Sequence, residues 1–512
     1  MRSTRLAGIG ARLITGVMTA ALALSVAAPA VSAQDEGGDL VVGVTSDADT
    51  LFPWKATQFQ AFTMLGLIYD NLVELDQNLD IVPGLAESWE ISDDGMTVTF
   101  DLREGVTFHD GTPMTSADVK ASLDAILLEE TGAVARAAIS SISSVDTPDD
   151  TTVVLNLSTP DAGLLAGLVG PNVGIVPAGA TEEELSNAPN GTGPFAFGER
   201  APNESLTMVA NENYWREGEP KLASVEFRVI PDETSIVDGL RAGAVQLAEL
   251  SDPIVALTAE GDGINIEKTP QLAYHVLMIN HTREPLGDVN VRLAMQCAID
   301  RQEVVDTAAL GEGTVIGPIT SPAYLSDPSA RPCPERDVER AKELLAEAGY
   351  EDGITIGGMY ATGEYAIAPN IAQNLQSQLA EAGINLELEP LEISAYVDRW
   401  LAADFDTVVA LNGGRPDPDT MYGRYFPSTG NLNQVATYSS ETMDELFARG
   451  KASSDPEERK QIYADISREL EDNAVWIWLL SSNKYSALTD DVQGFVPMPS
   501  TSLQYLRTTT VE

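Results

Sequence analysis

The sequence predicts an α/β protein built from more than one domain. With 512 residues, the chain is longer than a typical domain of about 100–200 residues, which favours two or three domains. Segments with the period of a β-strand and segments with the period of a helix alternate along it. We find no internal repeat and no flexible linker. Short crossings rather than a tether are therefore expected to join the domains, and such crossings suit a hinge.

The first third of the chain is predicted to be rich in strands. Residues 40–44 form an apolar run typical of a buried strand. Residues 61–75 have helical spacing, with Leu65, Ile68 and Leu72 along one stripe. Apolar and polar residues alternate, as in antiparallel strands with one solvated face, at residues 96–102, 106–108 and 151–157.

The later part of the chain has the pattern of β-α-β units. Residues 368–382 have helical spacing that ends at Gly383, and an alternating strand follows until Pro390. Asp455 is placed to cap a helix that carries apolar residues at a spacing of four. An apolar strand is expected at residues 474–480.

The first 33 residues are predicted to be a secretory signal and not part of the fold. Three arginines precede an apolar stretch at residues 13–30, and small residues follow at Val31 and Ala33. The alternative, an uncleaved membrane anchor, is disfavoured because the stretch is short and rich in alanine and glycine. Cleavage before Gln34 would leave an exported, soluble protein, and the lack of a cysteine there argues against a lipid anchor.

The charge balance excludes one class of partner. Asp and Glu number 78 against 30 Lys and Arg, a formal net charge of −48. A field of this sign repels phosphate backbones, so nucleic-acid binding is excluded for the chain as a whole. An acidic surface suits a soluble protein in an external, saline medium, and it also suits plain protection against aggregation.

The two cysteines are Cys297 and Cys333. In an oxidising compartment they are expected to form a disulfide, which would stabilise the fold by ~3–4 kcal/mol in the chain-entropy model. The alternative is two buried free thiols. The disulfide is favoured because Cys333 lies between two prolines in a loop rather than on an apolar face.

The chain lacks recognisable catalytic machinery, and no cofactor is expected. It contains three histidines, and His275 and His281 are six residues apart across a strand, which weakens a metal pair. No nucleophile elbow, P-loop, dinucleotide fingerprint or zinc-protease helix occurs. A binding protein is therefore favoured. A secreted hydrolase that uses paired carboxylates or His275 is kept as a remote alternative.

Several segments match a known family in order along the chain. They include a segment at residues 85–95 that begins Leu-Ala-Glu-Ser-Trp, a segment at 100–111 that ends Phe-His-Asp-Gly, and further segments at 191–195, 213–216, 228–232, 291–294, 298–301, 341–350, 383–385 and 417–418. This set closely resembles the signature of family 5 extracellular solute-binding proteins, the peptide, nickel and oligosaccharide receptors of ABC importers. The resemblance is specific for the family and weak for the ligand.

The resemblance implies a two-lobed, periplasmic-binding-protein-like clamp with a two-strand hinge. Lobe I is expected to comprise residues 34–273 plus 481–512, with an extra subdomain at about 64–188, and lobe II residues 274–480. The cleft between the lobes would close over a peptide or small-molecule ligand. The family implies a periplasmic monomer that delivers the ligand to an ABC permease complex in the inner membrane.

Two ligand anchors of the family's peptide receptors are replaced in this chain. The aspartate that holds a peptide amine aligns with Gly414, and the arginine that holds the carboxylate of a dipeptide aligns with Thr362. A simple zwitterionic dipeptide is therefore disfavoured. Arg415 is the only cation of its loop and is expected either to hold an anionic group of the ligand or to be a solvated or internally paired side chain.

The position of other residues in the family's pattern makes them candidates for the cleft. These candidates are Asp47, Thr50, Trp54, Gln58, Phe59, Tyr274, His275, Tyr360, Arg399, Trp400, Asp417 and Tyr422. Aromatic walls suit stacking on a peptide side chain or on a sugar face, although ordinary packing is a serious rival for Trp54 and Phe59. The ligand is thus expected to be peptide-like, with an oligosaccharide or a carboxylate-bearing metabolite as the alternative.

Overall fold

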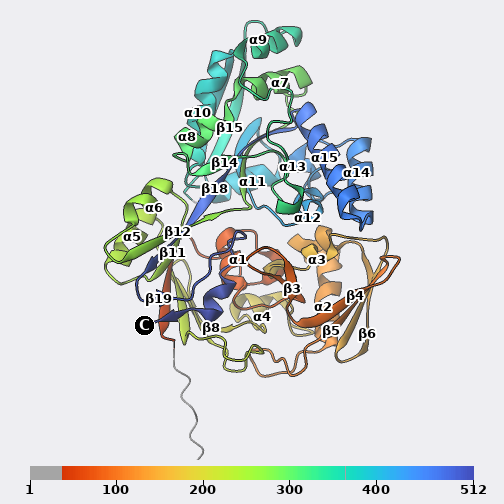
Figure 1. Cartoon of the computed structure of the whole chain (residues 1–512), viewed down its shortest axis with the longest axis vertical. Helices are drawn as coiled ribbons and strands as arrows, with labels where there is room; N and C mark the ends of the chain where they lie inside the picture. The colour runs from red at the N-terminus through yellow and green to blue at the C-terminus, as the bar shows by residue number, and fades with distance from the viewer. Residues whose placement is uncertain (1–36, 364) are drawn as a thin grey trace, which may run out of the picture. The chain divides into compact units, whose positions relative to one another are not determined.

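The computed structural model describes residues 37–363 and 365–512, so the predicted signal segment lies outside the described residues. The α/β class is confirmed, since helices and mixed sheets alternate along the chain (Figure 1). The strands of the twelve-stranded main sheet are β1 (Asp39–Val44), β8 (Phe195–Ala201), β9 (Ser205–Ala210), β10 (Ser224–Val229), β11 (Leu247–Leu250), β12 (Ile264–Pro270), β13 (Tyr274–Ile279), β14 (Gly313–Val315), β15 (Ile354–Thr362), β16 (Ile384–Glu392), β17 (Thr407–Asn412) and β18 (Trp476–Thr489).

The remaining strands form small sheets, and helices fill the connections. A four-stranded sheet has the order β4 (Ala86–Ile91), β5 (Thr97–Leu102), β7 (Thr152–Leu157), β6 (Ile142–Asp149), and the pairs are β2 (Val73–Leu75) with β3 (Ile81–Pro83) and β19 (Val492–Gln493) with β20 (Thr510–Val511). The helices are α1 (Phe59–Leu65), α2 (Ser116–Leu127), α3 (Leu164–Gly167), α4 (Glu182–Asn187), α5 (Glu233–Arg241), α6 (Pro253–Ala259), α7 (Val289–Ala298), α8 (Arg301–Ala308), α9 (Val338–Glu347), α10 (Ala368–Glu381), α11 (Ile393–Leu401), α12 (Pro418–Tyr422), α13 (Asn433–Ala436), α14 (Glu441–Ala452) and α15 (Pro456–Asp472).

The long strand β18 links two groups of strands in the main sheet. Its first half pairs with β13 and β14, and its second half pairs with β11 and β12 (Figure 1). The chain also passes from one group to the other between β12 and β13. Two strand connections therefore join the groups, and the lobe boundaries expected at residues 273/274 and 480/481 fall within them. The assignment of whole lobes stays a prediction.

In the group of strands that contains β13, the sheet is covered on both faces, and a separate hydrophobic cluster lies on each face. All six residues of β13 are buried. Leu277 and Ile279 belong to one hydrophobic cluster, while Val276 and Met278 belong to another. Successive side chains of a strand point to opposite faces, so β13 supplies both clusters. This burial on both faces explains the nearly continuous apolar sequence of the strand.

Two predicted elements differ from the structure because tertiary contacts intervene. The helix expected over residues 61–75 ends at Leu65. Just after this end, the backbone amides of Gly193 and Phe195 donate hydrogen bonds to the carbonyls of Ile68 and Leu67 at 2.9 and 3.0 Å. A Cβ atom at Gly191 would lie 2.1 Å from the Ile68 carbonyl oxygen, so only glycine allows this close approach. Residues 106–108 make an isolated bridge rather than a strand.

Other local predictions match the observed elements. The helix expected at residues 368–382 is α10, and Asp455 caps α15 by accepting hydrogen bonds from the amides of Glu457 and Glu458 at 2.9 and 3.2 Å. Cys297 and Cys333 form a disulfide that links α7 to the loop before α9. Within residues 37–363 and 365–512, no helix combines the length and the apolar character that crossing a membrane requires.

Candidate functional site

Three adjoining cavities lie where segments far apart in the sequence meet. The large cavity, of about 1000 Å³, lies between residues 127–172 and residues 415–451. The small cavity, of about 150 Å³, is lined by α1, residues 69–75, the loop at 413–416 and residues 499–507. Gly170 and Arg415 line both, and Phe59 lines the small cavity and a third one of about 50 Å³. Together they form the candidate site of the described chain.

The loop at residues 413–416 is fixed against its surroundings. It follows the buried strand β17 and precedes α12. A Cβ atom at Gly414 would lie 1.9 Å from the carbonyl oxygen of Leu272, so this position has no room for a side chain. The carbonyl of Arg415 accepts a hydrogen bond from the Ser321 hydroxyl at 2.7 Å. The backbone therefore holds the Arg415 side chain at the boundary between the large and small cavities.

The Arg415 guanidinium has neither an ion pair nor a side-chain hydrogen bond within the described residues. Its Nη1 atom lies 3.8 Å from the place that a Cβ at Gly170 would occupy. Burial lowers the pKa of Arg415 to about 10, and the positive charge of Arg424 contributes in the same direction. Arg424 also lines the large cavity, and nothing in its local sequence pattern pointed to it. The two arginines bring uncompensated positive charge to the site.

A second wall of the small cavity, at Asp70, Glu74 and Arg507, carries charges that are paired. Glu74 forms ion pairs with Arg216 at 2.9 Å and with Arg507 at 3.3 Å. Asp70 accepts a hydrogen bond from the Trp215 indole at 2.8 Å, while burial and the charge of Glu74 raise its pKa to about 6. The sequence analysis did not select Asp70 or Glu74. The sequence feature that could have indicated them is the polar and aromatic segment at residues 213–216, because Trp215 donates a hydrogen bond to Asp70 and Arg216 forms an ion pair with Glu74.

A direct contact borders the large cavity. The carboxylate of Asp161 and the ammonium of Lys451 are 3.1 Å apart, and the amide of Ala162 donates to the carbonyl of Lys451 at 2.9 Å. Asp419 lines the same cavity, and its pKa is raised to about 7 by burial, against the effect of Lys451. These contacts tie the segment before α3 to the end of α14.

Of the thirteen predicted ligand residues, the structure brings Phe59 and Arg415 to the cavities. Five others are aromatic side chains: Trp54, Tyr274, Tyr360 and Tyr422 are buried in the core, and Trp400 is partly buried and packs against it. The Trp54 indole donates to the Gly174 carbonyl at 3.0 Å, and Tyr422 accepts from the Trp478 indole at 2.9 Å. For these five, packing accounts for the aromatic side chain, and they do not line the three cavities.

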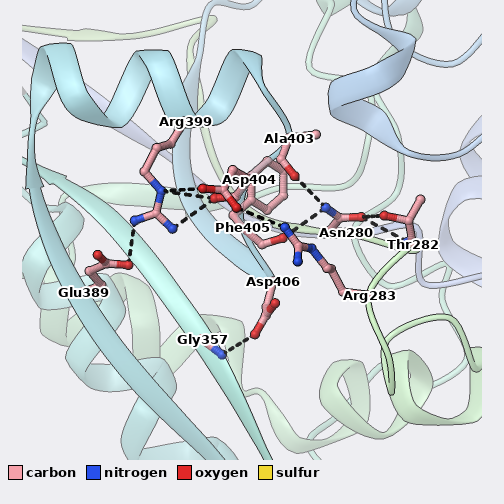
Figure 2. Close-up of polar contacts among 10 residues, drawn as sticks. All are labelled: Asn280, Thr282, Arg283, Gly357, Glu389, Arg399, Ala403, Asp404, Phe405 and Asp406. Atoms are coloured by element: carbon pink, nitrogen blue, oxygen red, sulfur yellow. Dashed lines mark hydrogen bonds and ion pairs between the residues drawn. The ribbon is translucent and has the colours of Figure 1, made fainter.

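Three predicted polar residues are engaged in structural ion pairs instead. Asp47 binds Arg200 at 2.8 Å, and Asp417 both caps α12 and binds Arg459 at 2.8 Å. Figure 2 shows the third, Arg399, between Glu389 at 2.8 Å and the carbonyl of Asp404 at 3.0 Å. Asn280 and Arg283 bind the same turn before β17 in that view. These side chains already have partners and do not line the three cavities.

The last three predicted residues also lie outside these cavities. Thr50 accepts a hydrogen bond from the Phe52 amide at 3.0 Å, and Gln58 precedes α1. His275 is buried, which lowers its pKa to about 3 and keeps the imidazole neutral. No group of three or more metal-ligating side chains occurs in the part of the chain that the structure describes.

Neither replaced anchor has a local substitute. Thr362 is exposed and donates to the Leu391 carbonyl at 3.1 Å. At Gly414, the Leu272 backbone fills the space that an aspartate would need. The geometry therefore offers a cation in the loop where the peptide receptors of the resembled family are expected to place a carboxylate.

Comparison with known proteins identifies the class of the chain. The family described as bacterial extracellular solute-binding proteins, family 5 Middle, matches residues 80–433. The glutathione-binding protein GsiB of Shigella boydii serotype 4 is 27% identical over 488 residues, covering 91% of this chain and 93% of that protein. The structure of PBP AgaA with agropinic acid, from A. tumefaciens R10, is similar with a TM-score of 0.85 and 30% identity, covering 93% and 99% of the two chains.

A second solved structure shares the fold. The oligopeptide-binding protein AppA from Bacillus subtilis, in complex with a nonapeptide, is similar with a TM-score of 0.83 and 25% identity, covering 93% of this chain and all of that one. The two-lobed fold class expected from the sequence is thereby confirmed, and a binding protein rather than an enzyme is the class that the relatives share. The chain belongs to the family 5 bacterial extracellular solute-binding proteins.

Proposed function

We propose that this receptor captures a small, peptide-like solute with an acidic group in the adjoining cavities. The single observation that carries the proposal is the Arg415 guanidinium, which has no ion-pair partner within the described residues and lines both the large and the small cavity. An arginine in such a place can bind a carboxylate through two hydrogen bonds. The alternatives within the same class are an oligosaccharide and a carboxylate-bearing metabolite.

Two relatives support an acidic ligand. One is named for binding glutathione, and the solved structure of the other contains agropinic acid. Both compounds are acids that also carry polar groups. We propose that the chain works in the periplasm as a soluble monomer and delivers such a solute to an ABC permease of the inner membrane.

Thermal unfolding in the presence of candidate solutes tests the ligand class. We expect glutathione-like peptides or acidic metabolites to raise the melting temperature, because a ligand at 100 times its Kd stabilises the native state by ~2.7 kcal/mol. Ordinary dipeptides are expected to bind poorly, since no carboxylate stands at Gly414. Micromolar dipeptide binding, measured by calorimetry and unaffected by Arg415→Ala, would contradict the proposal.

Small-angle scattering tests the clamp. If the two groups of strands move about their two connections, a bound ligand shifts an open form to a closed one and reduces the radius of gyration. The measurement compares ligand-free protein with protein saturated by a solute from the thermal screen. An unchanged scattering profile at saturation would count against closure.

A further inference from the structure

Two of the three arginines that line the large cavity, Arg415 and Arg424, are exceptional within this acidic chain. Acidic residues outnumber basic ones by 78 to 30, so most basic side chains have a carboxylate within reach. Among the described arginines, Arg292 and Arg331 lack an ion pair but donate to backbone carbonyls. Arg415 and Arg424 line one cavity, and neither forms an ion pair within the described residues.

The two guanidinium groups act on the same buried side chain. The carbon at the centre of the Arg424 guanidinium lies 4.7 Å from the centre of the Tyr425 ring. Burial raises the pKa of the Tyr425 hydroxyl, while the charges of Arg424 and Arg415 both oppose that rise. The Nε atom of Arg424 is buried without a hydrogen-bond partner. Both guanidinium groups therefore line one cavity and bring their positive charges to the same region of it.

The carboxylates that line the large cavity do not neutralise this pair. Glu129 lies 3.9 Å from Arg136, and Asp444 accepts hydrogen bonds from the amide and hydroxyl of Ser428 at 2.7 and 2.8 Å. The third, Asp419, forms no ion pair within the described residues: burial and the charges of Asp161 and Asp417 raise its pKa, while the charges of Lys451 and Arg459 lower it. No carboxylate of the cavity lining therefore forms an ion pair with Arg415 or Arg424 within the described residues. A bound anion would compensate the two arginines.

We propose that Arg415 and Arg424 together bind the acidic end of the solute, and that this end carries two negative charges. The inference deepens the proposed function and rests on it, because it assigns the charge and the position of a ligand in the same site. Gly170 leaves room beside Nη1 of Arg415 for that group. Guanidinium groups suit this role, since their planar donors match carboxylate oxygens and they lose hydration easily.

Binding of three probes of similar size, which differ in their number of carboxylates, tests the proposal. The probes are N-acyl glutamate, N-acyl glutamine and N-acyl glutamine amide, with two, one and no carboxylates, and with acyl groups from acetyl to dipeptidyl length. Calorimetry measures each Kd with the wild-type protein. We expect affinity to fall at least about tenfold with each lost carboxylate, as is typical of hydrogen bonds to charged groups.

Variants assign the effect to the two arginines. Arg424→Gln is expected to weaken the two-carboxylate probe at least about tenfold more than the one-carboxylate probe, and Arg415→Gln is expected to weaken both. Arg136→Gln is the matched control, because Arg136 lines the same cavity but already pairs with Glu129. Circular dichroism and thermal unfolding show that each variant is folded.

The outcomes separate this inference from the proposed function. Equal binding of the neutral and two-carboxylate probes would overturn the inference and leave the receptor function standing. The same conclusion follows if no acyl probe binds while neutral solutes from the thermal screen do. If no solute of any class binds, the proposed function fails and the inference fails with it.

Discussion

The two walls of the small cavity use their charges in opposite ways. On one wall, Glu74 binds Arg216 and Arg507, and these groups are mostly buried with their charges compensated. On the other wall, Arg415 has no counterion, and Arg424 beside it in the large cavity has none either within the described residues. A paired wall and an unpaired wall therefore face the same space.

The difference teaches which charges hold the fold together and which are available to a ligand. A buried ion pair whose partner is removed leaves an uncompensated charge, so the paired wall contributes to stability. An arginine that is partly buried without a counterion is unfavourable for the free protein, and burial lowers the pKa of Arg415 to about 10. That cost is relieved when an anion arrives.

The largest effect is expected from breaking the paired wall. Glu74→Gln removes the carboxylate of Arg216 and one of the two carboxylates that pair with Arg507, whose other partner is Glu219 at 3.1 Å, and the free energy of unfolding should fall by ~3–5 kcal/mol. Urea denaturation followed by circular dichroism measures it. The control is Glu87→Gln, whose partner Arg103 is 3.6 Å away at the surface and whose loss should change stability by ~0–1 kcal/mol. Similar losses in both variants would remove the distinction between the two kinds of pair.

A side chain forced into the unpaired wall should distort its loop. Gly414→Ala places a Cβ atom 1.9 Å from the Leu272 carbonyl oxygen, and we expect a loss of ~1–3 kcal/mol together with weaker ligand binding. Gly413→Ala is the matched control, because its Cβ would lie no closer than 3.7 Å to Phe59. Thermal unfolding and calorimetry on both variants check the expectation. A stable Gly414→Ala protein with normal binding would show that this loop yields easily.

The titration of Asp419 should make stability depend on pH. Its pKa is raised from 3.8 to about 7, so the folded protein holds this proton more tightly than the unfolded chain does. Its contribution to the free energy of unfolding is therefore largest below pH 4 and falls as the pH rises from about 4 to about 7. The stability of Asp419→Asn relative to wild type should increase over that window and then level off. A difference that does not change with pH would contradict the assignment.

The smallest effect is expected from removing an unpaired charge. Arg415→Met should change the free energy of unfolding of the ligand-free protein by less than about 1 kcal/mol, because no ion pair is lost. Arg459→Met provides the contrast, since it leaves the buried Asp417 without its partner at 2.8 Å and should cost ~3–5 kcal/mol. Denaturant titration of both variants decides between a structural and a ligand-binding role for Arg415.

The elements set by local patterns were predictable from the sequence. Alternation predicted β5 and β7, helical spacing predicted α10, and Asp455 with Pro456 predicted the start of α15. Such patterns depend on neighbours a few residues away, and the chain satisfies them wherever the segment lies. The helix expected to continue past Leu65 failed because backbone groups from residues 193–195 take over at Leu67 and Ile68.

The candidate site was only partly predictable because proximity within it does not follow from spacing. The aromatic candidates had the right composition for a cleft, but Tyr274 and Tyr422 fill the core between β13 and its covering helices. Asp417 was predicted to bind the ligand, but its carboxylate accepts a hydrogen bond from Arg459, which lies 42 residues later in α15. Polar type alone does not distinguish a free side chain from a paired one.

The family, the α/β class, several of the helices and strands, and an arginine beside the position of the missing peptide-binding carboxylate all followed from the sequence. Which charges are compensated depended on the tertiary structure. Glu74 and Arg507 are 433 residues apart, and no local pattern relates them. Arg415 and Arg424 become a candidate anion site because both line one cavity and neither forms an ion pair within the described residues. Charge compensation depends on distance in space, and folding alone sets that distance.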